Sequence, residues 1–221
     1  MPTALITGAG GGIGTAVAEA LAPTHTLLLC GRPSARLDAL AARLDATTWP
    51  LDLTEPETIE AGAEIVDSLD VLVHNAGVSR PARTADSALD DWRDTFEVNI
   101  FGTVALTLAL LPALRTGEGR VVFVNSGAGK RVSPGMASYS ARTFALRAFA
   151  DSLRDDEPSL RVTTVVPGRT DTAMQRELVA FEGGDYDPAR FLRPQTVAGV
   201  IAQVATAPPD AHVHDVVIRP R

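Results

Sequence analysis

Residues 7–14 read Thr-Gly-Ala-Gly-Gly-Gly-Ile-Gly and come directly after a short apolar run at Ala4–Thr7. They open a segment, Ile13–Leu21, with the apolar spacing of a helix. Glycines let a backbone turn tightly and approach a ligand, and a helix N-terminus offers free N–H groups and a positive dipole. A strand–turn–helix of this kind predicts a nucleotide-binding turn, with a merely flexible loop as the alternative. The candidate cofactor residues in it are Gly8, Gly10, Gly12, Ile13 and Gly14.

Short apolar runs alternate with helix-patterned segments along the rest of the chain. Several runs lack polar alternation, as expected for strands that are buried on both faces of a parallel sheet. The expected strands are Ala4–Thr7, Thr26–Cys30, Thr47–Trp49, Val71–His74, Val121–Asn125, Val162–Val166 and Val213–Ile218. The expected helices are Ile13–Leu21, Ser34–Leu44, Glu55–Ser68, Leu89–Leu114 (not continuous), Ser138–Asp155 and Pro194–Ala205. This alternation predicts an α/β fold, a single domain over residues 1–221 in which helices cover both faces of a doubly wound parallel sheet of about seven strands.

Composition excludes several other classes of protein. With 45% hydrophobic and 21% charged residues in 221, the chain is not intrinsically disordered. Its net charge of −7 argues against nucleic-acid binding. One cysteine, Cys30, allows neither an internal disulfide nor a cysteine-rich zinc site, and the histidines show no metal-ligand spacing. The most apolar stretch, residues 104–114, is too short to span a bilayer, and the start lacks the basic region of a signal peptide. We therefore expect a cytoplasmic protein without metal, membrane or nucleic-acid partners.

One long segment, Thr170–Arg193, reads as irregular and includes Gly183, Gly184 and Pro188. It follows the carboxyl end of an expected strand, where open α/β sheets bind their ligands. Loops of this length are usually functional lids or disordered. We predict a substrate lid.

Further short motifs follow the expected strands in a fixed order. They are Asp52-Leu53 after the third strand, Asn75-Ala76-Gly77 after the fourth, Asn99 in the next helical region, Ser126 after the fifth, Tyr139 13 residues later, and Pro167-Gly168 with Thr172 after the sixth. Together with residues 7–14, this series resembles the short-chain dehydrogenase/reductase family over nearly the whole chain. The resemblance implies a Rossmann-like fold and a nicotinamide cofactor.

The resemblance also implies a role for each of these residues. Asn99, Ser126 and Tyr139 stand at the catalytic positions, where the tyrosine transfers the substrate proton and the serine steadies the substrate oxygen. The remaining motifs, with Tyr139 and Thr143 near the ribose, stand at cofactor-binding positions. Asp52 and Leu53 would lie by the adenine, and Pro167, Gly168 and Thr172 by the nicotinamide.

The end of the second strand indicates which cofactor is used. An NAD enzyme generally carries a carboxylate there for the ribose hydroxyl, whereas an arginine suits the phosphate of NADP. This chain has Arg32 and no carboxylate until Asp38. Gly11 stands where many NADP-dependent members carry a second basic residue. We predict NADP(H) in preference to NAD(H), and a solvated arginine at the start of a helix is the alternative reading of Arg32.

The family's active-site lysine is missing. Its Tyr-x-x-x-Lys pattern reads Tyr139-Ser140-Ala141-Arg142-Thr143 here. The family lysine favours the tyrosinate, binds the ribose and feeds a proton relay, and Thr143 offers only a hydroxyl. Arg142, at i+3 from Tyr139, and Lys130 are the candidate substitutes. The expectation for both is an ordinary solvated surface cation, with compensation as the alternative.

Two functions from different classes fit these residues. The first is an NADP-dependent oxidoreductase that reduces a carbonyl or oxidises the matching secondary alcohol, with impaired or rewired proton transfer. The second is a catalytically silent NADP(H)-binding sensor or scaffold. The apolar helical segments 89–114 and 138–155, together with the family resemblance, also imply a homodimer or homotetramer, with full burial of these helices as the competing explanation.

Overall fold

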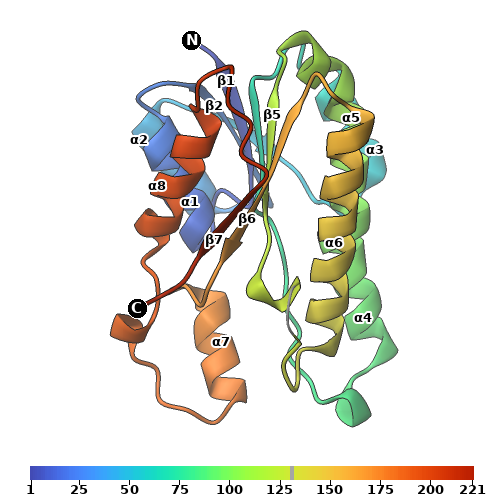
Figure 1. Ribbon diagram of the computed structural model, residues 1–221, viewed down its shortest axis with the longest axis vertical. Coiled ribbons are helices and arrows are strands. Elements are labelled where there is room, and N and C mark those ends of the chain that lie inside the picture. The colour runs from blue at the N-terminus through green and yellow to red at the C-terminus, as the bar shows by residue number, and fades with distance from the viewer. Residues whose placement is uncertain (130–131) are drawn as a thin grey trace.

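The computed structural model describes residues 1–129 and 132–221. Within them, seven strands form one parallel sheet in the order β3-β2-β1-β4-β5-β6-β7 (Figure 1). The strands are β1 (Thr3–Thr7), β2 (Thr26–Gly31), β3 (Thr47–Pro50), β4 (Val71–His74), β5 (Arg120–Val124), β6 (Arg161–Pro167) and β7 (Asp215–Ile218). The strand order reverses between β1 and β4, and this is the point at which doubly wound sheets bind ligands. The predicted fold class is confirmed.

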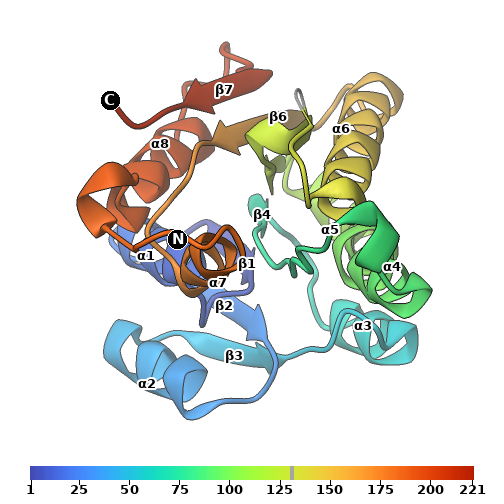
Figure 2. The same ribbon diagram turned by 90° about the horizontal axis from the view of Figure 1, so that it is seen from below.

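Helices cover both faces of this sheet (Figure 2). One face carries α1 (Gly12–Leu21), α2 (Ala35–Leu44) and α8 (Pro194–Ala205), and the other carries α3 (Pro56–Ala63), α4 (Leu89–Phe96), α5 (Gly102–Thr116) and α6 (Ala137–Asp156). Each layer has its own apolar core: Val17, Leu37 and Ile201 are buried on the first face, and Ile59, Leu106 and Leu146 on the second. The sheet is therefore buried on both sides, as the unbroken apolar runs predict.

The helical segment after β4 differs from the expectation because it is continuous. Helix α4 passes into α5 through a π-helical turn, η2 (Glu97–Phe101). By length and composition alone the run Leu89–Thr116 is long and apolar enough to cross a membrane. Here Leu106, Leu110 and Leu114 are fully buried against the sheet, which is the setting of a core helix.

The segment Thr170–Arg193 is not irregular, contrary to the prediction. It contains α7 (Ala173–Phe181), whose N-cap Thr172 accepts a hydrogen bond from the Gln175 N–H, and the short helix η4 (Pro188–Arg190). Figure 1 shows α7 beyond the carboxyl ends of the strands. The N–H of Asp171 donates to the Leu192 carbonyl, and that of Leu192 donates to the Arg169 carbonyl. These bonds close the segment at its neck, and we refer to residues 170–193 as the cap segment.

Two further short helices complete the described chain, η1 (Thr84–Asp86) and η3 (Gly127–Gly129). The last of these lies between β5 and α6, where it packs against α6. Lys130 lies outside the described residues, so its predicted alternatives stay open.

Candidate active site

A cavity of about 1250 Å³ opens at the carboxyl ends of the central strands. Of the predicted site residues, those that line it are Gly8, Gly10, Gly12, Ile13, Arg32, Asp52, Leu53, Asn75, Ala76, Gly77, Tyr139 and Thr172. They come from segments that are far apart in sequence, and the sheet brings them to one edge. The cavity is the candidate active site.

The glycine turn between β1 and α1 forms one wall of the cavity. Gly8 has φ +64°, a left-handed conformation that glycine adopts without strain. A Cβ on Gly14 would overlap the Gly8 carbonyl oxygen, so Gly14 serves the packing of the turn instead of lining the cavity. The N-cap of α1 is Gly11, which has no side chain to satisfy the first N–H groups of the helix. These free donors and the open backbone fit a pyrophosphate group.

Thr7 and Asn75 fasten this turn to β4. The Thr7 hydroxyl accepts hydrogen bonds from the N–H groups of Asn75 and Ala76, both at 3.0 Å. The side-chain amide of Asn75 donates to the carbonyl oxygens of Thr7 (3.1 Å) and Gly8 (3.2 Å). The turn is thereby held in one shape before any ligand arrives.

The far end of the cavity is basic. Arg32 follows β2 and is exposed at the cavity wall, near Asp52 and Leu53. The pKa of Asp52 is lowered mainly by hydrogen bonds from the N–H and hydroxyl of Thr54, with a smaller contribution from Arg32. Sequence reasoning missed Arg36, which lines the cavity from the first turn of α2. Arg36 lies only four residues after Arg32 in the sequence, and this short spacing could have indicated a second cation at the same end of the cavity.

Asn99 lies in the π-helical turn and is buried. Its side-chain oxygen accepts from the Val78 N–H (2.9 Å), and its amide donates to the carbonyls of Val78 (3.0 Å) and Thr95 (2.7 Å). Its side chain therefore holds the segment after β4, and Asn99 is not among the residues that line the cavity.

Ser126 precedes η3 and Tyr139 follows it, and of these two predicted catalytic residues only Tyr139 is among those that line the cavity. Ser126 follows β5, and its hydroxyl accepts from the Ala128 N–H at 3.3 Å. Tyr139 is half-buried in the first turn of α6 and lines the cavity. Asn125, a lining residue that the sequence reading left out, donates to the Thr143 carbonyl at 3.1 Å and so ties β5 to α6.

Arg142 is not a surface cation, and this corrects the sequence expectation. It is 5% exposed and lines the cavity, and its guanidinium carbon lies 4.0 Å from the centroid of the Tyr139 ring. Burial lowers the pKa of Arg142, and the neighbouring Tyr139 acts in the opposite direction. Thr143 is fully buried, and its hydroxyl donates to the Ser140 carbonyl. Of these two neighbours, it is Arg142 and not Thr143 that faces the cavity.

The Pro167–Thr172 region reaches the site at one point only. Pro167 ends β6, and the Gly168 N–H donates to the Ile218 carbonyl at 2.7 Å, so both residues serve the sheet edge and do not line the cavity. Thr172 does line it, with its methyl group close to Gly12. The cap segment therefore meets the glycine turn at its N-terminal end.

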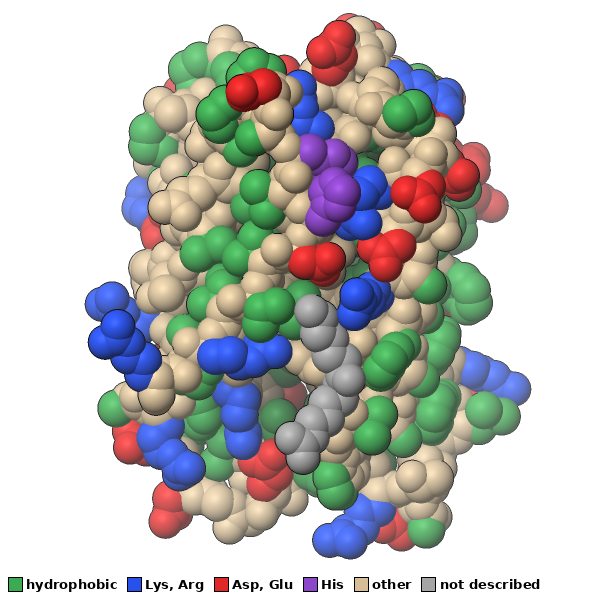
Figure 3. All heavy atoms as spheres, in the orientation of Figure 1, with side chains coloured by type: hydrophobic (Ala, Val, Ile, Leu, Met, Phe, Trp, Pro, Cys, Tyr) green, Lys and Arg blue, Asp and Glu red, His purple; other side chains and the backbone are tan. Residues whose placement is uncertain are grey.

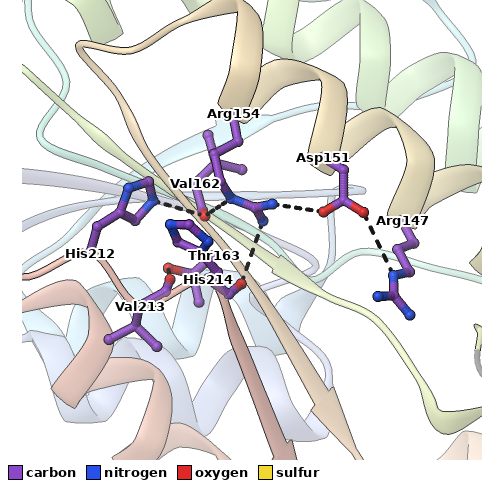
Figure 4. A network of polar contacts seen from close by, with 8 residues as sticks. All are labelled: Arg147, Asp151, Arg154, Val162, Thr163, His212, Val213 and His214. Atoms are coloured by element: carbon purple, nitrogen blue, oxygen red, sulfur yellow. Dashed lines mark hydrogen bonds and ion pairs between the residues drawn. The ribbon is translucent and has the colours of Figure 1, made fainter.

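The histidine pair His212 and His214 is exposed and is not among the residues that line this cavity. Figure 3 shows histidine side chains (purple) at the surface of the molecule. The two residues precede β7, which begins at Asp215, so the predicted strand from Val213 starts too early. Their rings pack edge to face at 4.5 Å, and His212 Nε2 contacts the Val162 carbonyl. Figure 4 shows Arg154 beside them, donating to the same carbonyl and to Asp151. Within the described ranges, no group of histidine, cysteine and carboxylate residues has the arrangement of a metal site.

Comparison with known proteins agrees with this geometry. The family described as short chain dehydrogenase matches residues 2–183. The chain is 34% identical over 99% of its length to the glycine betaine reductase ATRR of Emericella nidulans, of which it spans only 18%. It is 30% identical to dehydrogenase/reductase SDR family member 11 of Mus musculus, covering 98% of this chain and 93% of that protein.

A solved structure has the same architecture. The alcohol dehydrogenase from the archaeon Thermococcus sibiricus, complexed with 5-hydroxy-NADP, superposes with a TM-score of 0.90 at 26% identity, covering 98% of this chain and 95% of that one. The glycine turn, the strand order and these matches have one explanation. The chain belongs to the short chain dehydrogenase family.

Proposed function

We propose that the protein is an NADP(H)-dependent oxidoreductase that reduces a carbonyl compound or oxidises the matching secondary alcohol. The observation that carries the proposal is that Tyr139 lines the same cavity as the glycine turn and Arg32. The glycine turn and Arg32 would hold the nicotinamide cofactor, which would supply or accept the hydride. The Tyr139 phenol then gives its proton to the substrate oxygen during reduction, or takes it during oxidation, and Ser126 holds that oxygen by a hydrogen bond.

The preference for NADP(H) is proposed from the charges at the far end of the cavity. Arg32 and Arg36 both line it, and guanidinium groups bind phosphate through paired, charge-assisted hydrogen bonds. Arg36 takes the place of the second basic residue that Gly11 does not provide. The structural relative with a bound NADP analogue supports the same cofactor.

A second candidate is an NADP(H)-binding protein without catalysis. The observation that favours it is that Thr143 is buried and cannot supply a cation at the ribose. The two candidates separate in one experiment, in which NADPH binding is titrated and NADPH oxidation is followed with a panel of carbonyl compounds. Turnover that disappears in Tyr139→Phe supports the enzyme. Tight NADPH binding without turnover on the whole panel supports the binding protein.

We also propose that the protein forms a homodimer or homotetramer through α5 and α6. Large apolar side chains on this run of helices are exposed, namely Phe101, Leu108 and Phe144. They leave an apolar surface on helices whose other sides already pack in the core. This surface is available to a second copy of the chain.

A further inference from the structure

Arg142 differs from the other arginines of α6 in its surroundings. Arg147 and Arg154 form ion pairs with Asp151 near the surface. Arg142 is buried, and no carboxylate pairs with it among the described residues. Its Nε has no hydrogen-bond partner there either. A buried, unpaired guanidinium is unfavourable for folding, which points to a role in the cavity that it lines.

The Tyr139 ring takes the place of an ion-pair partner for the Arg142 guanidinium. A cation over the face of an aromatic ring is attracted by the negative charge of the π-system, and the attraction grows when water is excluded. At 4.0 Å from the ring centroid, the Arg142 guanidinium carbon is close enough for this attraction. An ionised phenol carries a full negative charge, so the same cation binds it more strongly than the neutral ring.

We propose that Arg142 is a positioning residue that holds the Tyr139 ring and stabilises its phenolate, in place of the missing lysine. The inference rests on the proposed role of Tyr139 as the group that transfers the substrate proton. Arginine stays protonated, so Arg142 supplies charge and orientation but does not pass a proton on. The proton of Tyr139 is instead exchanged with solvent, to which the cavity opens.

Other charged groups line the same cavity, and the carboxylates among them act against the phenolate whereas the arginines favour it. Of the elements packed against α6, α4 and η2 bring Asp94 and Glu97 to the same cavity, and η3 carries no ionisable side chain. The one ionisable side chain of strand β6 is Arg161, at the N-terminal end of the strand and away from the cavity. Arg80 lines the cavity from the segment after β4. When Arg142 is removed, the charged side chains that still line the described cavity are the cations Arg32, Arg36 and Arg80 and the carboxylates Asp52, Asp94 and Glu97.

The sequence offers a direct measurement because the chain has only two tyrosines, Tyr139 and Tyr186. In a Tyr186→Phe background, the ultraviolet absorbance of tyrosinate reports Tyr139 alone, without cofactor or substrate. We compare Arg142→Met with Arg142→Lys, and use Arg147→Met as the matched loss of one charge on the same helix. Circular dichroism at each pH confirms that every variant is folded.

The expected result is that Arg142→Met moves the ionisation midpoint of Tyr139 to higher pH by about 1–3 units, the usual effect of a neighbouring charge. Arg142→Lys moves it less, and Arg147→Met leaves it in place. Equal midpoints in Arg142→Met and the parent overturn the proposal. If Arg142→Met does not fold, Arg142→Gln replaces it, with the same two outcomes.

Activity provides an independent readout. In Arg142→Met the kcat for alcohol oxidation falls more than that for carbonyl reduction, because oxidation starts from the phenolate. The pH–rate profile of oxidation moves to higher pH. A protein without turnover whose absorbance midpoint still shifts retains the Arg142–Tyr139 pairing but contradicts the proposed function.

Discussion

The Thr143 hydroxyl donates a hydrogen bond of 2.7 Å to the Ser140 carbonyl, one turn earlier in α6. This bond turns the Thr143 side chain toward its own helix, and the residue is fully buried. The position at which the sequence motif predicts a lysine therefore contributes to packing here, and the neighbouring Arg142 brings a cation to the cavity.

We expect Thr143→Lys to increase the kcat of alcohol oxidation by about tenfold, since a lysine adds a proton path to the charge that Arg142 already supplies. In an Arg142→Met background the gain in kcat is larger because the lysine then supplies the charge as well. We expect about 10²-fold, which corresponds to a lowering of the activation free energy by about 2.7 kcal/mol. Steady-state kinetics in both directions test this. Tyr139→Phe must abolish the gain, and no gain in either background, with NADPH binding intact, contradicts it.

Arg32→Ala should weaken NADPH binding by about tenfold or more, because one charge-assisted hydrogen bond contributes roughly 1.5–3 kcal/mol. Arg36→Ala should have a smaller effect in the same direction. Neither substitution should change NADH binding, since the 2′-phosphate is absent there. Fluorescence titration of both cofactors measures this, and equal affinities of the unmodified protein for NADPH and NADH would refute the preference.

Gly14→Ala should lower the free energy of unfolding by about 1–3 kcal/mol, because its methyl group would overlap the Gly8 carbonyl in a turn that cannot relax freely. Gly10→Ala is the matched control, since its nearest neighbour is the Ser34 hydroxyl at 3.8 Å. It should leave stability nearly unchanged and weaken cofactor binding, as Gly10 lines the cavity. Denaturant unfolding and NADPH titration separate the two effects. A similar loss of stability in both variants would show that the overlap is not the cause.

His74 should make the protein sensitive to acid. Its Nε2 lies 2.9 Å from the Thr107 hydroxyl, which itself donates to the Thr103 carbonyl, so Nε2 carries the proton and the buried Nδ1 is left without a partner. Burial lowers the pKa of His74 to about 3. The unfolded chain binds this proton near pH ~6.5, so stability is full above that pH and falls as the pH drops toward 3.

At pH ~5 the loss should be about 2 kcal/mol relative to neutral pH. The variant His74→Leu keeps a buried apolar side chain there and should lose this component of the pH dependence. Urea unfolding at several pH values measures the difference. Parallel curves for the two proteins between neutral pH and pH ~5 would rule out His74 as the source.

The proposed assembly should be disrupted by a charge on its apolar surface. Phe144 is 47% exposed and Leu108 is 60% exposed. Phe144→Glu and Leu108→Glu should each yield a monomer of unchanged secondary structure, as measured by light scattering and circular dichroism. A monomeric mass for the unmodified protein at micromolar concentration would contradict the assembly itself.

The strands could be predicted from sequence to within one or two residues because burial on both faces leaves unbroken apolar runs, as in β4 and β5. The glycine turn was equally clear, since a tight turn and close packing demand glycine at Gly8 and Gly14. Helix α7 was missed because Gly183, Gly184 and Pro188 dominated the reading of its segment, although Thr172 was an ordinary N-cap signal.

The surroundings of single side chains were harder to predict. Spacing placed Arg142 near Tyr139 on α6 but did not show whether it faces water or the cavity, because that depends on how α6 packs on its neighbours. The sequence likewise did not show that α4 and α5 form one continuous helical segment. A π-helical turn inserts extra backbone without ending the helix, and the apolar pattern loses its phase at that place.

The closed neck of the cap segment has a consequence for how such proteins diversify. Its two ends are joined by two backbone hydrogen bonds, one from Asp171 to Leu192 and one from Leu192 to Arg169. Neither bond involves the residues between Asp171 and Leu192. The entropy of closing a loop rises only slowly with its length, so residues can be gained or lost beyond such a junction at little cost to folding. The seven-stranded sheet can thus remain constant while the cap segment beyond its carboxyl ends changes in length and sequence.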